Sequence, residues 1–431
     1  MEKKRILIIS GEAWQDNTNG GNVLTNLFGS MSDCFEYAQI YCNQNLPNNA
    51  VCKHYFHLSE AEILKAFFTR KPLGHRLTEQ ELLQAAVSPE VPDTPLAAWA
   101  RKLRFDIFYT LQDCMFYCSY WKTPALADFI RQFNPDIVFA PLYYRIHMHL
   151  LDRYVSRLTG KKLVSYVSDD YYSYRQFSLS PVYWFNRWVL HKNIEATSKY
   201  IQLLYTMTRE QLNEYRDALR VPMKILRKAA NFDDTPPFKT TLNTPLKLLY
   251  GGNLIYNRWK TMAYVVNALR SINRNEVLIQ LYIYSQTTLT KQMEQALHDG
   301  RNSFFMGKVS AHDLELQQAT ADILLHVESF DLRQRLVTRL SFSTKLVDLM
   351  HSARCIVAIC WKESSPYKYL HTQDAAICVD HPSRIKDVLL RLLYNPTLLN
   401  TYANKAWACG KRNHNKKEII ENLKNELCAI H

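Results

Sequence analysis

The chain has 431 residues, of which 47% are hydrophobic and 22% charged, and this composition excludes intrinsic disorder of the whole chain. No apolar run approaches the roughly 18–20 residues that span a bilayer, so an integral membrane protein is also excluded. The net charge is +13, and residues 226–431 hold 27 basic and 18 acidic side chains. We therefore expect the second half to bind any phosphate-bearing partner.

Short apolar runs alternate with helical patterns through the first half. The run Ile6–Ile9 follows a charged start, is too short for a signal peptide and is interpreted as a buried strand. Similar runs and helical patterns follow at 37–41, 124–133, 136–140, 144–158, 163–167 and 201–205. This alternation predicts β-α-β units with a parallel sheet. The stretch 58–99 fits the alternation poorly and is interpreted as an insertion.

The alternation is interrupted at 231–245, where three prolines and little apolar material predict an interdomain linker and hinge. Apolar runs and helical patterns resume beyond it, at 246–250, 260–272, 277–283, 303–305, 312–320, 322–327, 345–352, 355–359 and 376–379. The sequence thus predicts an α/β protein with two Rossmann-like, doubly wound domains facing a central cleft, at 1–230 and 246–410. A basic helical tail at 411–431 completes the chain.

The ten cysteines show no C-x-x-C pair and no histidine at zinc-ligand spacing. This pattern is typical of reduced core cysteines in a cytosolic protein, with no metal site.

Glycine pairs follow the first strand of each predicted domain. Gly20 and Gly21 precede a helical pattern at 23–28. They either let backbone N–H groups approach a phosphate closely or form a tight β-α turn. The dinucleotide fingerprint G-x-G-x-x-G is absent, which argues against a dehydrogenase. In the second half, Gly251 and Gly252 precede Arg258 and Lys260, which form either a diphosphate clamp or a solvated basic helix start.

Residues 340–358 carry the most specific pattern. Ser343 and Thr344 are expected to cap a helix whose free N–H groups face a bound anion. Lys345 and Asp348 share one face of that helix, so Lys345 can meet a phosphate while Asp348 accepts hydrogen bonds from a ribose. A plain capped helix with an ion pair between these two residues is the alternative.

This segment resembles the E-G-F-G-x-x-x-x-E-A-M-A-S-G-x-P-V-V-A pattern of the GT-B-fold, retaining glycosyltransferases of family 4, especially those of bacterial polysaccharide biosynthesis. The matching positions are Phe342, Met350, Ser352, Val357 and Ala358. Asp348 stands where the family's second Glu binds ribose, and Leu340 replaces the first Glu, which contacts the donor sugar. The family's G-R-L-x-x-x-K-G segment is similar to 252–259, with Asn253 in place of its Arg and Arg258 in place of its phosphate-binding Lys.

The resemblance implies a glycosyltransferase that moves a sugar from a nucleotide diphosphate sugar, with retention and without a metal or other cofactor. It implies a base-binding backbone at 305–310, around Val309, although a β-α turn capped by Ser310 explains that segment equally well. The acceptor, a polysaccharide or a lipid-linked saccharide, is expected on the first domain. In that domain, Asp169 or Asp170 either orients the hydroxyl group of the acceptor or caps the next helix. Glu328, at the end of a predicted strand, is a candidate to bind the donor sugar in place of the Glu that Leu340 replaces.

The expected site therefore combines catalytic Arg258, Lys345 and Asp169 with donor-binding residues, namely Gly20, Gly21, Gly252, Asn253, Val309, Glu328, Ser343, Thr344 and Asp348. The aromatic and basic segment 183–192 is either a core-facing helix or a membrane-interface helix. It suggests a cytoplasmic protein associated peripherally with an anionic membrane, on its inner face. No nucleic-acid-binding motif accompanies the positive charge. A protein that binds nucleotide sugar or polysaccharide without turnover is the alternative function.

Overall fold

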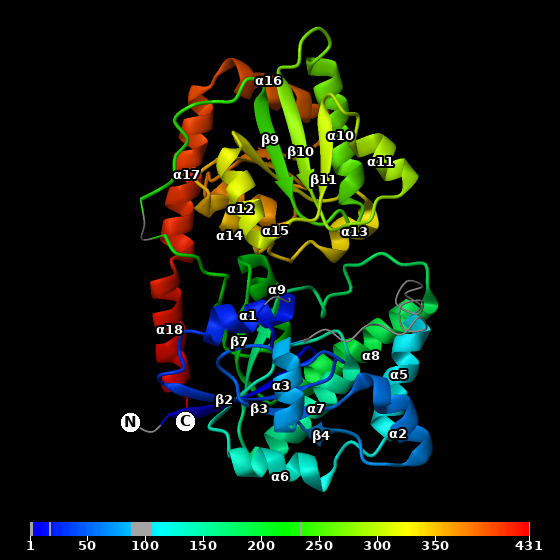
Figure 1. The fold of residues 1–431 in the computed structure, drawn as a ribbon. Helices are drawn as coiled ribbons and strands as arrows, with labels where there is room; N and C mark the ends of the chain where they lie inside the picture. The colour runs from blue at the N-terminus through cyan, green and yellow to red at the C-terminus, as the bar shows by residue number, and fades with distance from the viewer. Residues whose placement is uncertain (1–2, 17–18, 88–105, 233–234, 431) are drawn as a thin grey trace. The chain divides into compact units, whose positions relative to one another are not determined.

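The computed structural model describes residues 3–16, 19–87, 106–232 and 235–430, which form two compact units. Contacts assign Met1–Leu226 and Ile420–His431 to the first unit, and Arg227–Ile419 to the second (Figure 1). The last part of the predicted insertion, 88–99, lies outside the described residues.

The first unit is built on an eight-stranded sheet with the order β4-β3-β2-β1-β5-β6-β7-β8. Neighbouring strands are parallel except β3 and β4, which are antiparallel. The strands are β1 (Lys4–Ser10), β2 (Phe35–Tyr41), β3 (His54–His57), β4 (His75–Arg76), β5 (Ile137–Phe139), β6 (Leu163–Val167), β7 (Ile201–Thr206) and β8 (Met223–Ile225). The parallel sheet predicted from the apolar runs is confirmed, and the short strands β3, β4 and β8 were not predicted.

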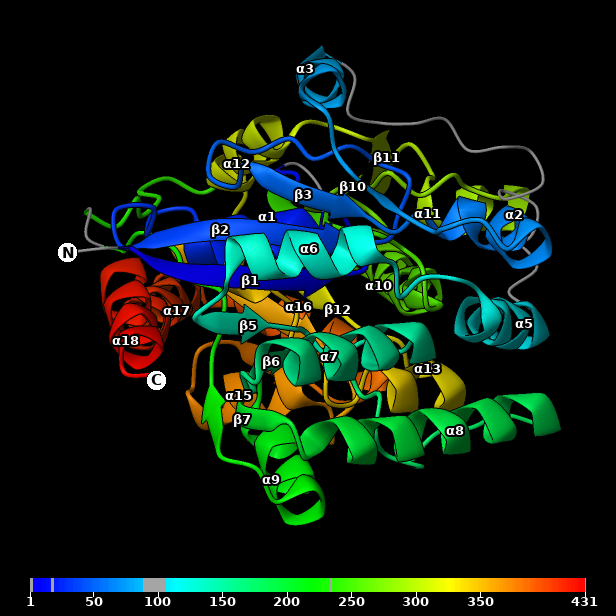
Figure 2. The same ribbon diagram turned by 90° about the horizontal axis from the view of Figure 1, so that it is seen from below.

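Helices connect these strands, and α6 and α7 lie next to each other beside the sheet (Figure 2). The helices are α1 (Asn19–Phe28), the 3-10 turn η1 (Glu60–Glu62), α2 (Ile63–Thr69), α3 (Glu79–Val87), α5 (Asp106–Cys118), α6 (Pro124–Phe133), α7 (Ile146–Thr159), α8 (Pro181–Ser198), α9 (Arg209–Leu219) and, from Ile420 on, α18 (Lys416–Cys428). Thr123 caps α6 by accepting a hydrogen bond from the Leu126 N–H, and Pro124 occupies the first helical position, where its missing N–H costs nothing.

The second unit contains a six-stranded, all-parallel sheet with the order β11-β10-β9-β12-β13-β14. This is the Rossmann order 3-2-1-4-5-6. The strands are β9 (Leu246–Gly251), β10 (Ile279–Tyr284), β11 (Ser303–Gly307), β12 (Ile323–Val327), β13 (Cys355–Ile359) and β14 (Ile377–Val379). Strands β12 and β13 are buried along their whole length, as strands covered on both faces must be. The predicted α/β class with two Rossmann-like sheets is therefore confirmed.

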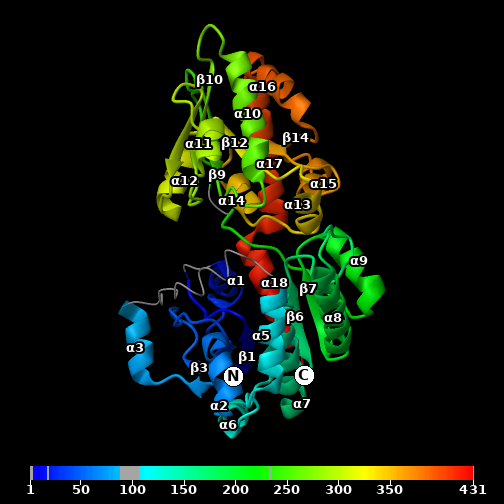
Figure 3. The same cartoon turned by 90° about the vertical axis from the view of Figure 1, so that its right-hand side faces the viewer.

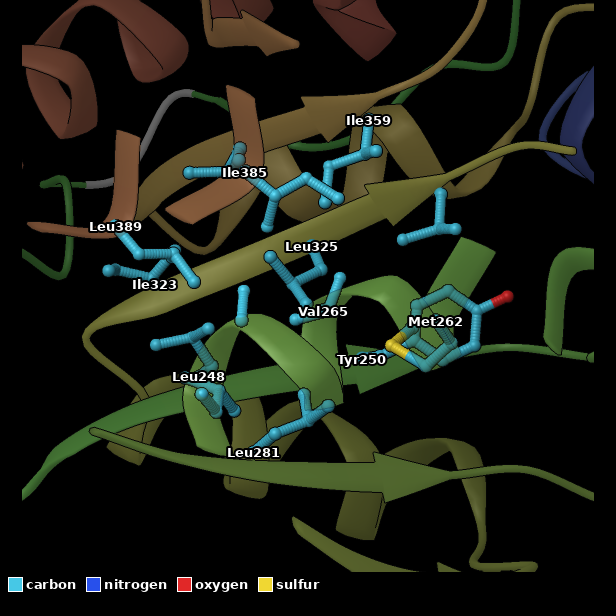
Figure 4. Close-up of a cluster of buried hydrophobic side chains, with 14 of the residues drawn as sticks. Leu248, Tyr250, Met262, Val265, Leu281, Ile323, Leu325, Ile359, Ile385 and Leu389 are labelled. Carbon is cyan, nitrogen blue, oxygen red and sulfur yellow. The ribbon is translucent and has the colours of Figure 1, made fainter. Parts of the chain in front are cut away.

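The helices of the second unit cover this sheet, and α14 packs against α17 (Figure 3). They are α10 (Arg258–Ile272), α11 (Lys291–Leu297), α12 (Ala311–Thr320), α13 (Leu332–Val337), α14 (Lys345–His351), α15 (Ser365–Thr372), the 3-10 turn η2 (Pro382–Arg384), α16 (Ile385–Tyr394) and α17 (Thr397–His414). The core between the sheet, α10 and α16 includes Val265, Leu281, Leu325 and Leu389 (Figure 4).

The residues predicted as a linker, 231–245, group with the second unit. The Phe232 ring is fully buried against Trp407 and leaves no room for a side chain at Gly410. Further along, the Lys239 ammonium lies 2.5 Å from the buried Asp322 carboxylate. These contacts attach the beginning and the middle of the segment to the second unit, and the chain changes unit after Leu226 and again after Ile419.

All ten cysteines are described and none of them forms a disulfide. Among the described residues, no helix is both long enough and apolar enough to cross a membrane.

Candidate functional site

The second sheet reverses its direction of winding between the adjacent strands β9 and β12. Strands β10 and β11 lie on one side of this point, and β13 and β14 on the other. In open α/β sheets, ligands bind at the carboxyl ends of the strands at such a switch point. Gly251 ends β9 there, and Glu328 directly follows β12.

An ion pair joins these two strand ends. Arg258, the first residue of α10, donates from Nε and Nη2 to the two carboxylate oxygens of Glu328, both at 3.0 Å. Burial tends to lower the pKa of Arg258, but the Glu328 carboxylate more than offsets this effect, so the pKa is raised. Two consecutive residues before Arg258, Tyr256 and Asn257, have left-handed φ values of 57° and 59°. Non-glycine residues avoid this region, and such strain concentrates at functional sites.

Lys345 brings a second positive charge to the same place. It is the first residue of α14 and remains accessible to solvent, but desolvation by the surrounding protein, followed by the repulsion from Arg258, lowers its pKa to about 8. The ammonium lies so close to Gly252 that a Cβ at this position would be 2.5 Å from Nζ. Gly252 is therefore required for the approach of Lys345 to the end of β9.

His326 is a further member of this group that the sequence did not single out. It lies in β12 and is 5% exposed. Its Nε2 is 3.9 Å from a Glu328 carboxylate oxygen, and this nitrogen has no hydrogen-bond partner. Burial lowers its pKa to about 4, so the ring is neutral at pH 7. The signal in the sequence that could have identified His326 is a polar residue within the apolar run 323–327. We refer to Arg258, His326, Glu328 and Lys345 as the switch-point cluster.

Asp348 lies near Lys345, as the helical spacing predicts, and influences its pKa. Its ion-pair partner, however, is Lys228, whose Nζ is 2.6 and 2.8 Å from the two carboxylate oxygens. Lys228 precedes the predicted linker and was not connected with the site by the sequence.

Three other residues at or near the predicted donor site have surroundings that the sequence did not predict. Thr344 is the N-cap residue of α14 but makes no capping hydrogen bond through its side chain, so the hydroxyl cap predicted for Ser343 and Thr344 is wrong. Leu340, the position of the family's first Glu, is fully buried among core residues. The side-chain oxygen of Asn253 is buried and has no hydrogen-bond partner, whereas the backbone carbonyl of the same residue accepts a hydrogen bond from the Tyr250 hydroxyl.

Val309 lies in the turn between β11 and α12, at the carboxyl end of β11. Gly307 has a φ of 76°, which allows the turn, and Ser310 accepts a hydrogen bond from the Asp313 N–H at 3.1 Å. The predicted cap of α12 by Ser310 is thus confirmed. A backbone that faces a nucleobase at Val309 stays a prediction.

The first unit holds the remaining predicted residues. Gly20 and Gly21 lie in the first turn of α1, which begins at Asn19 and so starts earlier than the expected helical pattern at 23–28. A phosphate contact at these glycines stays a prediction. Asp169 accepts a hydrogen bond from the Tyr171 hydroxyl at 3.1 Å. Asp170 is buried, pairs with Arg187 at 3.4 Å, and accepts from the Ser173 N–H.

A second charged cluster, not predicted, lies at the carboxyl edge of the first sheet. The fully buried His147 contacts the Asp113 carboxylate through Nδ1 at 2.7 Å, and its Nε2 is 3.3 Å from Glu60. Arg145 also contacts Asp113. Burial alone would lower the pKa of His147, but the hydrogen bond to Asp113 holds it well above its usual value.

Among the described residues, no group of three or more His, Cys, Asp or Glu side chains is arranged to hold a metal ion. The metal-independent reaction and the absence of another cofactor remain predictions, to be tested by adding a chelator.

Comparison with known proteins finds similarity in structure alone. No family model and no curated protein matches the sequence. Similar solved structures include Anabaena Alr3699/HepE in complex with UDP, at 12% identity over 99% of this chain and 100% of that one, with a TM-score of 0.61. Sucrose-phosphate synthase from Thermosynechococcus elongatus is 11% identical over 100% of both chains, with a TM-score of 0.64. A UDP-forming trehalose-phosphate synthase from Burkholderia vietnamiensis is 11% identical over 99% and 100%, with a TM-score of 0.60. The chain therefore has the two-domain fold of the GT-B glycosyltransferases.

Proposed function

We propose that this chain is a glycosyltransferase that takes its sugar from a nucleotide diphosphate sugar. The observation that carries the proposal is the pair of cations, Arg258 and Lys345, that lie close enough to repel each other at the switch point of the second sheet. Holding two like charges close together is unfavourable unless a ligand or a carboxylate compensates them. Glu328 compensates one charge, and a diphosphate supplies the remainder. Several structures with this fold are complexes with UDP or UDP-glucose, which supports the same ligand class.

The chemistry at such a site is mainly electrostatic. When the bond between sugar and diphosphate breaks, negative charge develops on the leaving oxygen, and Arg258 and Lys345 are positioned to stabilise it. In this proposal Asp348 binds the ribose, the backbone at Val309 meets the base, and Glu328 accepts hydrogen bonds from the sugar. The attacking hydroxyl transfers its proton to the leaving diphosphate on the same face, so the configuration is retained. Asp169 of the first unit orients the acceptor, a polysaccharide or a lipid-linked saccharide.

The test is turnover. The purified protein is incubated with a panel of UDP-, GDP- and ADP-sugars, and the release of nucleoside diphosphate is measured with and without a chelator and with candidate saccharide acceptors. Release from at least one donor, lost in Lys345→Met and kept in Lys260→Met, supports the proposal. Lys260 was the other basic residue of the candidate clamp, but it is about half exposed and pairs with Asp331, which favours the solvated alternative for this residue and makes it a suitable control.

The alternative function is binding of a nucleotide sugar or polysaccharide without transfer. The observation that favours it is the burial of Leu340 in the core at the position where the family has a sugar-binding Glu. Tight binding of a nucleotide sugar with no release of diphosphate, with any saccharide acceptor, would select this function.

We further propose that the protein associates peripherally with anionic membranes on the cytoplasmic side. One stripe of α8 exposes Val182, Phe185 and Trp188 by 37%, 55% and 51%, and continues to the exposed Lys192. The opposite stripe, with Leu190 and Ile194, is buried, so the predicted core-facing role of this helix also applies. Exposed aromatic and basic residues together favour an anionic lipid interface.

Flotation with liposomes tests this association. Wild-type protein is expected to float with anionic liposomes at low salt and to be released at high salt, whereas Phe185→Ser/Trp188→Ser should remain in solution. A matched change elsewhere, Tyr394→Ser, removes an aromatic that is 72% exposed on α16 and should have no effect. Wild-type protein that stays in solution at low salt would refute the proposal.

A further inference from the structure

The chain enters the second unit at Arg227, and its next residue, Lys228, contacts the site directly. Lys228 Nζ lies 2.6 and 2.8 Å from the two oxygens of the Asp348 carboxylate. The Arg227 guanidinium lies over the Tyr369 ring at 4.9 Å and over the Phe342 ring at 5.9 Å. Two consecutive cations of the entering segment are therefore held by residues of the second unit.

The backbone of this segment is fixed by hydrogen bonds to the end of α17. His414 Nδ1 is 3.0 Å from the Lys228 carbonyl oxygen, and the Ala230 N–H donates to the His414 carbonyl oxygen, also at 3.0 Å. The Lys416 N–H in turn donates to the Ala230 carbonyl. Phe232, two residues further, is fully buried. Lys228 thus extends from a backbone that is held on both sides.

The Asp348 carboxylate retains capacity for a ligand in this arrangement. A carboxylate has about four acceptor positions, and one ammonium contact at each oxygen leaves the others available. The Asp348 side chain is 44% exposed, whereas Lys228 is 22% exposed. Part of the carboxylate therefore remains open to solvent, where the hydroxyl groups of a ligand can donate hydrogen bonds to it.

We propose that Lys228 is a positioning residue that orients Asp348 for the two hydroxyl groups of the donor's ribose, and that it thereby links ribose binding to the segment where the chain enters the second unit. The inference rests on the proposed nucleotide-sugar function, which assigns the ribose to Asp348. Lys228 also neutralises Asp348, whose charge would otherwise oppose an incoming diphosphate.

Calorimetry with a ribose and a dideoxyribose ligand tests the proposal. Wild-type protein is titrated with UDP, GDP and ADP, and the tightest of them is compared with its 2′,3′-dideoxy analogue. In Lys228→Met, which keeps the length of the side chain, the affinity for the ribose ligand is expected to fall roughly 5- to 30-fold, as the loss of one or two hydrogen-bond contributions predicts. The affinity for the dideoxy analogue should change much less. In Asp348→Asn, the additional Lys228→Met change should have little further effect, because Lys228 acts through the carboxylate.

Lys405→Met is the matched control, since Lys405 forms a comparable ion pair with Asp374 in the same unit. Hydrogen exchange gives a second readout, and the ribose ligand should slow exchange at 227–232 more than the dideoxy analogue does. Equal losses for both ligands in folded Lys228→Met, or no loss for either, would overturn the inference while leaving the nucleotide site intact. If none of the three diphosphates binds wild-type protein, the proposed function and the inference both fail.

Discussion

Removal of the negative charge of Glu328 tests the electrostatics of the switch-point cluster. At pH 7 the cluster holds two cations, Arg258 and Lys345, and one carboxylate, with His326 neutral. Glu328→Gln therefore raises its net charge from +1 to +2. Gln has the same shape and still accepts a hydrogen bond from Arg258, so the fold should be retained.

The expected gain in affinity follows from Coulomb's law. A diphosphate that contacts Arg258 would lie roughly 6 Å from the carboxylate, and at an effective dielectric constant of about 20 the repulsion removed is up to ~3 kcal/mol per unit charge. Solvent at the edge of the sheet reduces this value, so we expect nucleoside diphosphates to bind Glu328→Gln about 5- to 150-fold more tightly, a gain of roughly 1–3 kcal/mol. Because Glu328 is also proposed to contact the sugar in the transition state, turnover should fall.

Isothermal titration with UDP, GDP and ADP, together with the diphosphate-release assay, measures both effects. Glu363→Gln is the control, since Glu363 is half exposed and pairs with Lys368 in the same unit. Unchanged affinity in folded Glu328→Gln would show that the diphosphate does not bind beside Arg258, and the reasoning would be refuted.

Three further predictions follow from single residues. Since the pKa of Lys345 is about 8, nucleotide affinity should decline above pH 8 in wild-type protein but not in Lys345→Arg, and titration across pH 7–10 measures this. The lowered pKa also raises the free energy of unfolding as pH rises from 8 toward 10.5, because the unfolded chain then holds a proton that the folded chain has lost. Gly252→Ala should weaken diphosphate binding by displacing the Lys345 ammonium, with little change in the urea midpoint; a full-affinity variant would contradict this role for glycine. His147→Phe should lower the free energy of unfolding by about 3–5 kcal/mol, because Asp113 and Glu60 lose a buried cationic partner. The loss should be largest near pH 5–6.5, where His147 is fully protonated, and urea unfolding at several pH values would measure it.

Much of the fold could be predicted because buried parallel strands appear in the sequence as short apolar runs. The runs at 163–167 and 355–359 coincide with β6 and β13, and the pattern at 124–133 coincides with α6, whose Thr123 and Pro124 mark its start. Strand β3, with histidine at both ends, lacks such a run and was missed.

The parts of the candidate site that depend on local sequence could be predicted. Arg258 and Lys345 are the first residues of the helices α10 and α14, so their positions follow from the order of the elements. The partners that define their charge, Glu328 for Arg258 and Lys228 for Asp348, are 70 and 120 residues away in the sequence, and such contacts depend on tertiary packing. The prolines at 231–245 likewise signal an irregular segment, but not its attachment to the second unit through Phe232 and Lys239.

The central claim is that Arg258 and Lys345 bind the diphosphate of a nucleotide donor. Calorimetry with nucleoside diphosphates on wild type, Lys345→Met, Glu328→Gln and Arg258→Met/Glu328→Gln tests it most directly, the double change avoiding an unpaired carboxylate in the cluster. A charged hydrogen bond to phosphate contributes ~1.5–3 kcal/mol, so Lys345→Met should bind about 10- to 150-fold more weakly than wild type, and the double variant should bind more weakly than Glu328→Gln by the same factor, while Lys260→Met binds as wild type does. Wild-type affinity in folded Lys345→Met, together with equal affinity in the double variant and in Glu328→Gln, would mean that the diphosphate binds elsewhere and would contradict the account.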